Sequence, residues 1–197
     1  MRGVTRTALT AAGKQALTRV PQQVSLAKTA FPQWTNGAAV EQQAAPLRKE
    51  GFEDLGAYLT NAFPDLLIRM MAHPTSFVAA HIYDHPKSGS WIEFVTRYTN
   101  GTTDTLTTLP PTGMDSPEWI HKIQADKSTP TDQLYRQFLE QRAQDGIRQV
   151  APKDAVQEFE EIYSRIIQWR GQHGISPEEV AHIALRVAQA RAQSTNI

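Results

Sequence analysis

Short apolar segments, each bounded by turn residues, follow one another through residues 51–127 and constrain the fold more than any other feature. Strand-length runs with turn signals at intervals of about 8–12 residues are typical of antiparallel strands joined by hairpins. The sequence therefore predicts an antiparallel β-meander of about five or six strands. The first two segments also fit a helical period, so a helix there is the alternative. The segments are 55–60, 66–71, 76–83, 91–99, 103–109 and 119–125.

Asn100-Gly101 lies between two β-rich runs and predicts a tight hairpin. Asn-Gly favours a two-residue type I′ turn, because both central residues then take positive φ. Such a turn places Arg97 opposite Asp104 as a charge pair, and Val95 opposite Leu106 on the same face. We therefore expect helices on one face of the sheet and partial cover, by the N-terminal segment, on the other. The other face carries Ile92, Phe94 and Tyr98.

After residue 128 the apolar period becomes helical. A cap residue, a proline and an early acid at 128–132 predict the start of one helix. A second helix is predicted over 152–170, and a capping box at 176–179 opens a third that runs to residue 193. Strands followed by helices indicate an α+β fold rather than an alternating α/β fold.

Charge is distributed unevenly along the chain, although 20 Lys+Arg balance 20 Asp+Glu. Residues 1–40 contain no acid. We expect 1–50 to form a basic N-terminal helix and a linker that Pro and Asn-Gly interrupt. Residues 51–197 then form a single α+β domain, with its sheet in 51–127 and its helices in 128–193. The basic residues of the N-terminal part are Arg2, Arg6, Lys14, Arg19 and Lys28.

The basic N-terminal helix has three interpretations: a cleaved transit-like segment, a membrane-surface helix through residues 1–28, or a helix that packs on the body or on a partner. Its apolar stripe is mostly alanine, so it would bind lipid weakly without anionic head groups. No run of 18 apolar residues exists, so we expect no transmembrane segment. The expected location is cytoplasmic, with peripheral attachment to the inner membrane as the alternative.

Titratable side chains gather around the third and fourth predicted strands, at His81, Asp84, His85 and Glu93. Imidazole and carboxylate groups can hold a metal, and a glutamate against an apolar wall can act as a general base. Histidines in turns and a glutamate on a strand surface are more often structural. The chain also has no cysteine and no known catalytic motif. We therefore predict no catalytic residue and no cofactor, and keep this cluster as low-priority metal candidates.

Several motifs between residues 51 and 145 resemble a group of uncharacterised bacterial proteins. In that group a GFxxLGxY opening leads to an HP…GxWxE…Yx(D/N)G core. The resemblance implies a bacterial origin and assigns no functional residue. Members often carry a membrane-spanning segment before this domain, whereas this chain has none there. The matching residues are 51–58 (GFEDLGAY), His73-Pro74, His85-Pro86, Gly89, 91–93 (WIE) and 98–102 (YTNGT).

Together these features predict a non-enzymatic protein-interaction module, in one version a bacterial immunity- or accessory-type protein. Its partner would be another protein or a second copy of itself, contacted through the basic residues of 1–28 and through Trp119. Nucleic acid is disfavoured, because the body is acidic and no aromatic residue precedes Phe31 among the basic residues. A small metal-dependent or acid–base enzyme and a membrane-surface adaptor are the alternatives.

Overall fold

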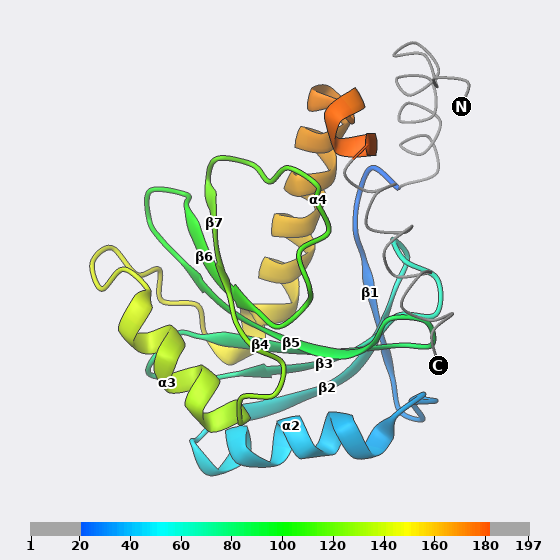
Figure 1. Ribbon diagram of the computed structural model, residues 1–197. Coiled ribbons are helices and arrows are strands. Elements are labelled where there is room, and N and C mark those ends of the chain that lie inside the picture. Colours follow the sequence, from blue (N-terminus) through cyan, green and yellow to red (C-terminus); the bar gives the residue numbers. More distant parts are fainter. Residues whose placement is uncertain (1–20, 182–197) are drawn as a thin grey trace.

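One mixed sheet with helices on both of its faces makes up the described part of the protein, which therefore has an α+β fold (Figure 1). The computed structural model describes residues 21–181. Its elements in chain order are β1 (Leu26–Thr29), α2 (Gly37–Lys49), β2 (Glu53–Thr60), β3 (Leu67–Ala72), β4 (Ala79–His85), β5 (Gly89–Arg97), β6 (Thr103–Thr107), β7 (Ile120–Gln124), α3 (Thr131–Gln141), the 3₁₀ turn η1 (Pro152–Asp154) and α4 (Ala155–His173).

The described sheet has seven strands, which lie side by side in chain order from β1 to β7. The first six strands pair antiparallel, whereas β7 runs parallel to β6. Five of the six predicted segments correspond to the antiparallel strands β2–β6, and the strands at 53–60 and 67–72 exclude the helical alternative there. The sixth segment, 119–125, is β7, but its expected antiparallel pairing is wrong, because it runs parallel to β6. Because β7 runs parallel to β6, the chain must first return to the end of the sheet at which β6 begins. The connection formed by residues 108–119 is long enough for this, whereas a hairpin turn is not.

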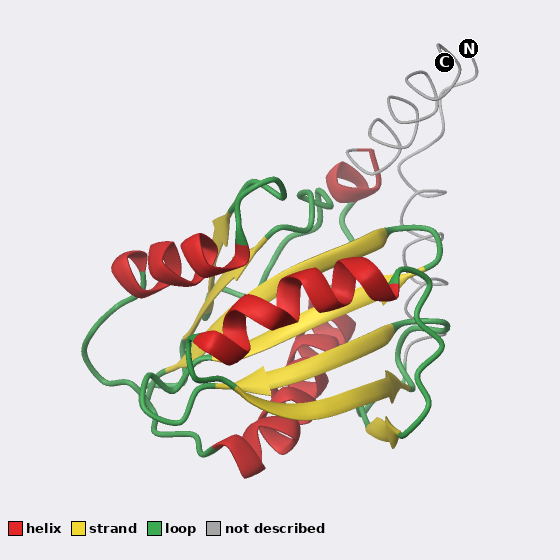
Figure 2. Ribbon diagram, turned by 90° about the horizontal axis from the view of Figure 1, so that it is seen from below, coloured by secondary structure: helices red, strands yellow, loops and turns green. Residues whose placement is uncertain are grey.

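Helices α2 and α3 cover one face of the sheet, and Figure 2 shows α2 in front of the sheet, running roughly along its strands, with α4 behind the sheet. Alternate side chains of the central strands point toward these two helices. The rings of Phe94 and Phe138, both fully buried, stack at a centroid distance of 6.1 Å. This first core consists of Val40, Ala44, Leu47, Phe52, Met71, Val78, Ala80, Ile82, Ile92, Phe94, Leu106, Leu134, Tyr135 and Phe138.

Helix α4 crosses the opposite face, where it contributes Phe159 to a second core. The same helix also holds the segment before β1. Ser164 Oγ accepts a hydrogen bond from the Val24 amide at 2.8 Å, and Glu160 Oε1 accepts one from the Leu26 amide at 2.7 Å. The sequence predicts that the N-terminal segment partly covers this face. The cover is instead mainly α4, a helix from the C-terminal half of the chain. This second core contains Val24, Tyr58, Leu66, Ile68, Met70, Tyr83 and Phe159.

The structure corrects the expectation of a linker within residues 21–50, because β1 and α2 lie there. The Asn36-Gly37 pair predicts a break in the chain, yet Asn36 is the N-cap of α2 and its side chain accepts a hydrogen bond from the Ala39 amide. Residue types that are common in turns, such as Asn, are also common at helix N-termini. In both places the side chain accepts hydrogen bonds from free backbone amides. Pro46 lies inside α2, so proline was an unreliable sign of a linker here.

Two of the three predicted C-terminal helices are confirmed by α3 and by η1 with α4. The predicted capping box is also present. Ser176 Oγ accepts a hydrogen bond from the Glu179 amide at 3.0 Å, and Glu179 Oε2 accepts one from the Ser176 amide at 2.8 Å. Residues 177–181 are helical. The rest of that helix and the predicted basic N-terminal helix lie outside the described residues.

The hairpin at Asn100-Gly101 differs by one residue from the predicted register. Phe94 pairs with Leu106 and Arg97 with Thr103. The Tyr98 amide donates to the Thr102 carbonyl, and the Gly101 amide donates to the Tyr98 carbonyl. Gly101 has a φ of 85°, whereas Asn100 is not among the residues with positive φ. This is a three-residue loop with a glycine bulge instead of a type I′ turn.

The one-residue shift moves the charge pair apart, because neighbouring residues of a strand face opposite sides. Arg97 points toward α4 and forms an ion pair with Glu158. Asp104 lies on the other face, where it accepts a hydrogen bond from Tyr98 Oη at 2.7 Å. The predicted Arg97–Asp104 pair is therefore wrong.

Candidate binding groove

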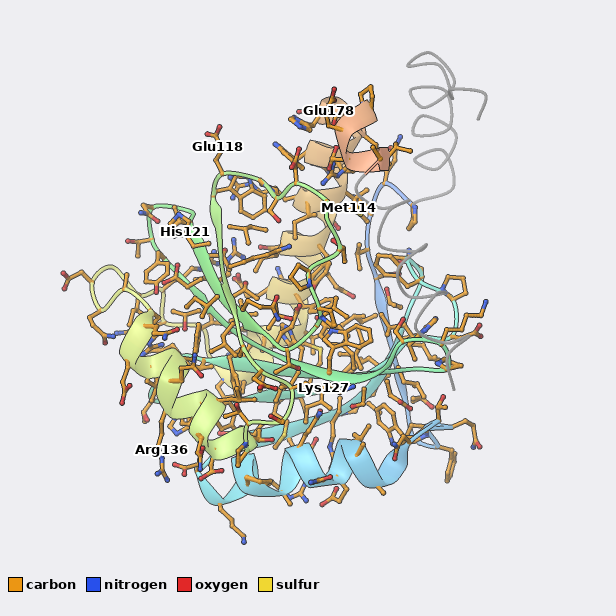
Figure 3. All side chains as sticks on the ribbon, in the orientation of Figure 1. Met114, Glu118, His121, Lys127, Arg136 and Glu178 are labelled. Carbon is orange, nitrogen blue, oxygen red and sulfur yellow. The ribbon has the colours of Figure 1, made fainter. Side chains whose placement is uncertain are left out.

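A groove with a volume of about 380 Å³ lies between α4, strands β5–β7 and the loop that joins β6 to β7. Figure 3 shows this loop rising beside α4, with Met114 labelled. The groove is lined mostly by apolar side chains. Helix α4 contributes the largest share, namely Phe159, Ile162, Tyr163, Ile166, Ile167 and Arg170.

Alternation along the strands decides which sheet residues form the floor of the groove. Glu93 and Val95 of β5 face α4, and their partners Thr107 and Thr105 on β6 lie on the same side. Leu106, between the two threonines, belongs to the core under α2 and α3. The observed register therefore places a row of threonine side chains under α4.

Arg170 near the end of α4 holds the loop that closes the groove. Its guanidinium donates to Glu179 Oε1 at 2.7 Å and to the backbone carbonyl of Asp115 in the loop. Glu179 Oε1 also accepts a hydrogen bond from the Asp115 amide at 2.7 Å. Burial alone would raise the pKa of Glu179, but the hydrogen bonds from Ser176, Asp115 and Arg170 outweigh it and lower the pKa. The loop is thus attached to α4 through a charged, largely buried network.

Glu93 and two tyrosines form a compact polar cluster on the α4 face. Glu93 Oε2 lies 3.0 Å from both Tyr83 Oη and Tyr163 Oη, and the two hydroxyl oxygens lie 2.8 Å apart. Thr107 Oγ1 donates to Glu93 Oε1 at 3.1 Å. Burial, and then the charge of Glu93, raise the pKa of both tyrosines well above 10. Both hydroxyls therefore stay protonated and serve as donors.

His81 lies next to this cluster, directly opposite Glu93 in the sheet. It is only 3% exposed, and its ring contacts Phe159 edge-on at a centroid distance of 4.9 Å. Neither ring nitrogen has a hydrogen-bond partner among the described residues. Burial lowers the pKa of His81 to about 3, so the ring is neutral at physiological pH.

Thr103 is the second polar residue of the groove without a partner. Its side chain is on the floor near the β5–β6 hairpin, opposite Arg97, and is 1% exposed. Within residues 21–181 its hydroxyl makes no hydrogen bond. Polar atoms that are buried in proteins almost always have partners, so both His81 and Thr103 need an explanation.

The four predicted metal candidates do not converge. His81 and Glu93 line the groove, whereas Asp84 faces α2 and accepts hydrogen bonds from the amides of Thr35 and Asn36. His85 ends β4, and its Nδ1 accepts hydrogen bonds from the amides of residues 87 and 88 in the β4–β5 turn. Among residues 21–181 no group of three or more His, Asp or Glu side chains could hold a metal ion. The structure thus separates the cluster into a groove pair and two structural residues.

The two predicted interaction residues that the structure describes, Lys28 and Trp119, are not among those that line the groove. Lys28 Nζ lies 5.9 Å from the centre of the Tyr58 ring. Trp119 is half-buried, and the Arg165 guanidinium covers its ring at 3.9 Å. Residues 21–181 contain no helix with the length and apolar character needed to cross a membrane. The remaining candidates, Arg2, Arg6, Lys14 and Arg19, lie outside the described residues.

Sequence reasoning missed Tyr163 and Thr103 as residues of the site. Tyr163 fits the apolar stripe of its helix, and Thr103 begins a threonine-rich strand, so neither pattern marks a site. The available signal was that the helix stripe contains a tyrosine and that the strand is rich in threonine. Both surfaces are therefore only partly apolar. Which of them would meet depended on the register of β5 and β6, which the sequence did not yield.

No protein-family model matches the chain, and no curated protein and no solved structure is significantly similar to it. The resemblance to the bacterial group therefore stays a prediction. Any functional proposal rests on the geometry of the groove.

Proposed function

We propose that this protein is a non-enzymatic binding protein, and that the groove beside α4 is its binding site. The observation that carries the proposal is the groove itself. Its volume of about 380 Å³ lies within the range of about 300–1,000 Å³ typical of small-ligand pockets. Apolar walls with a few placed polar groups, such as Glu93 and His81, are the usual construction of such sites.

The polar groups of the groove favour binding over catalysis. A general acid or base works best when its pKa lies near the operating pH. The pKa of His81 is about 3, and those of Tyr83 and Tyr163 lie well above 10. These three side chains keep one protonation state across neutral pH, so they are suited to orient a ligand.

Binding of a partner protein, our expectation from the sequence, is the second candidate. Phe63 and Met114 line the groove and are 49% and 39% exposed. Large apolar side chains exposed together at the rim of a groove are typical of interaction sites. Replacing both by serine should then weaken self-association measured by light scattering, or capture of a partner. If light scattering shows that the wild type and the variant are both strictly monomeric, self-association is contradicted.

The groove is tested with N-phenyl-1-naphthylamine, an uncharged dye that becomes fluorescent in apolar surroundings. We expect saturable fluorescence with the wild-type protein. Ile166→Trp should fill the groove and weaken dye binding at least tenfold, because Ile166 is half-buried and lines the groove. Gln168→Trp, at an exposed position of the same helix, is the matched control and should bind the dye as the wild type does.

Two results would contradict the proposal. The first is the absence of saturable dye binding to the folded wild-type protein. The second is equal binding by the Ile166→Trp and Gln168→Trp variants, which would place the dye elsewhere. Circular dichroism spectra of both variants establish that they are folded before they are compared.

A further inference from the structure

Two buried polar side chains of the groove have hydrogen-bonding capacity that nothing in residues 21–181 uses. Both nitrogens of His81 and the hydroxyl of Thr103 lack partners. A neutral imidazole offers one N–H donor and one acceptor, and a hydroxyl offers both functions. Leaving such groups buried and unpaired destabilises a protein, unless a ligand completes their hydrogen bonds. Their position in an apolar groove therefore points to the ligand.

These two residues lie toward opposite ends of the floor. His81 on β4 is opposite Glu93, whereas Thr103 on β6 is opposite Arg97, four residues further along β5. At about 3.3 Å per residue and about 4.8 Å per strand, they are separated by about 13 Å along the strands and about 10 Å across them. Between them the lining is mainly apolar, with Val95 on the floor and Ile162 and Ile166 on α4.

The charge near His81 selects against an anionic ligand. Glu93 lies directly opposite His81, and its carboxylate already accepts hydrogen bonds from Tyr83, Tyr163 and Thr107. A carboxylate at the same end would be repelled by Glu93 at short range. A ligand cation would lose its hydration against the apolar walls with little return from an already satisfied carboxylate. At the other end Arg97, opposite Thr103, is already paired with Glu158, so its charge gives little return to an anion there. An alcohol or a carbonyl group carries neither cost.

We infer that the groove binds an uncharged, elongated, apolar molecule with an alcohol or carbonyl group at each end, one bonded to His81 and the other to Thr103. This inference rests on the proposed function of the groove. The ligand class is set by the separation of the two unpaired groups, by the apolar lining between them and by the charge of Glu93.

The probes 1,10-decanediol, 1-decanol and decanoate test this class, because they share one apolar chain and differ at its ends. Each is titrated against the bound naphthylamine dye. We expect the diol to displace the dye and decanoate to be at least tenfold weaker than 1-decanol, because of Glu93. His81→Leu and Thr103→Val remove one hydrogen-bonding end each while keeping a similar side-chain volume.

Each variant should weaken diol binding about tenfold, which corresponds to one lost hydrogen bond. Binding of 1-decanol should weaken in only one of the two variants, since it has only one hydroxyl group. Dye affinity should change less than about twofold in both variants. The variants are expected to fold, because each replaces an unpaired buried polar group by an apolar one.

The inference is overturned if the dye binds normally but both variants keep the wild-type affinity for the diol. It is also overturned if decanoate binds as tightly as 1-decanol. Both outcomes differ from failure of the proposed function, in which the dye itself does not bind to the groove.

Discussion

The two faces of the sheet are covered differently, and their buried polar groups differ accordingly. On the face under α2 and α3, Asp84 holds the amides at the start of α2, and Arg142 bonds to Thr96 and to the Ser76 carbonyl. On the α4 face, His81 and Thr103 have no partner within the described chain. Asp84 Oδ1 and Arg142 Nε on the first face also lack partners, but other atoms of both side chains are hydrogen-bonded, whereas no side-chain polar atom of His81 or Thr103 is bonded within residues 21–181.

Coverage explains this difference. Two helices pack on the first face and bury a large aromatic and aliphatic core. A single long helix crosses the second face, and a helix of about 10 Å diameter cannot cover a seven-stranded sheet. In residues 21–181, the strip over β5–β7 that α4 leaves open is the groove, and the loop that Arg170 holds forms one of its walls. A groove therefore arises where the sheet is wider than the helix that covers it.

The largest expected effect contrasts the two faces directly. Phe94→Ala, in the core under α2 and α3, should lower the free energy of unfolding by about 4 kcal/mol, because Phe94 is fully buried and its loss leaves a cavity. Ile166→Ala in the groove should cost only about 1 kcal/mol, since Ile166 is half-buried. Urea unfolding measures both. Similar losses at the two positions would mean that the groove is packed like the core.

Acid should destabilise the protein through His81. The unfolded residue takes up a proton below its ordinary pKa of 6.5, whereas the folded residue does so only near its pKa of about 3. The free energy of unfolding should therefore fall as the pH falls from about 6.5, by about 1.4 kcal/mol per unit, or about 3 kcal/mol at pH 4.

His81→Leu should remove this part of the acid sensitivity. Above pH 7 the free energy of unfolding should change with pH in the same way in both proteins. Urea unfolding between pH 4 and pH 8 compares the two proteins. Parallel curves over the whole range would show that His81 is accessible to protons in the folded state, contrary to its burial in the groove wall.

The smallest expected effects test the hairpin that decides which residues face the groove. Gly101→Ala should destabilise the protein by about 1 kcal/mol, because φ of Gly101 is 85°. Gly171→Ala, in α4 with no atom near the added methyl group, should stabilise it by about 1 kcal/mol. Thermal or urea unfolding distinguishes the signs. A neutral Gly101→Ala would argue against the three-residue loop.

Much of the fold could be predicted from local patterns. Strands β2–β7 and helices α3 and α4 were expected within a few residues of their observed bounds, since period and turn residues act over short distances. The parallel direction of β7 was not expected. Helix α2 was missed because Asn36 caps a helix with the same chemistry that would have let it form a turn. Strand β1 was missed because its four residues have no alternating pattern of their own.

The site was predicted only in part. His81 and Glu93 were recognised as chemically notable, and they do meet in the groove. Asp84 and His85 were grouped with them because they are close in sequence, yet Asp84 faces the opposite side of the sheet. Tyr163 and Thr103 come from a distant helix and from a strand whose register was displaced by one residue.

The sequence by itself determined the α+β class, most strands and the two long C-terminal helices, because these follow from periodicity and capping. It also determined that charge is unevenly divided between the two parts of the chain. Only the tertiary structure decided which side chains share the groove. That outcome depends on a single glycine bulge at Gly101 and on where α4 crosses the sheet. Both are long-range consequences of packing, and no local pattern encodes them.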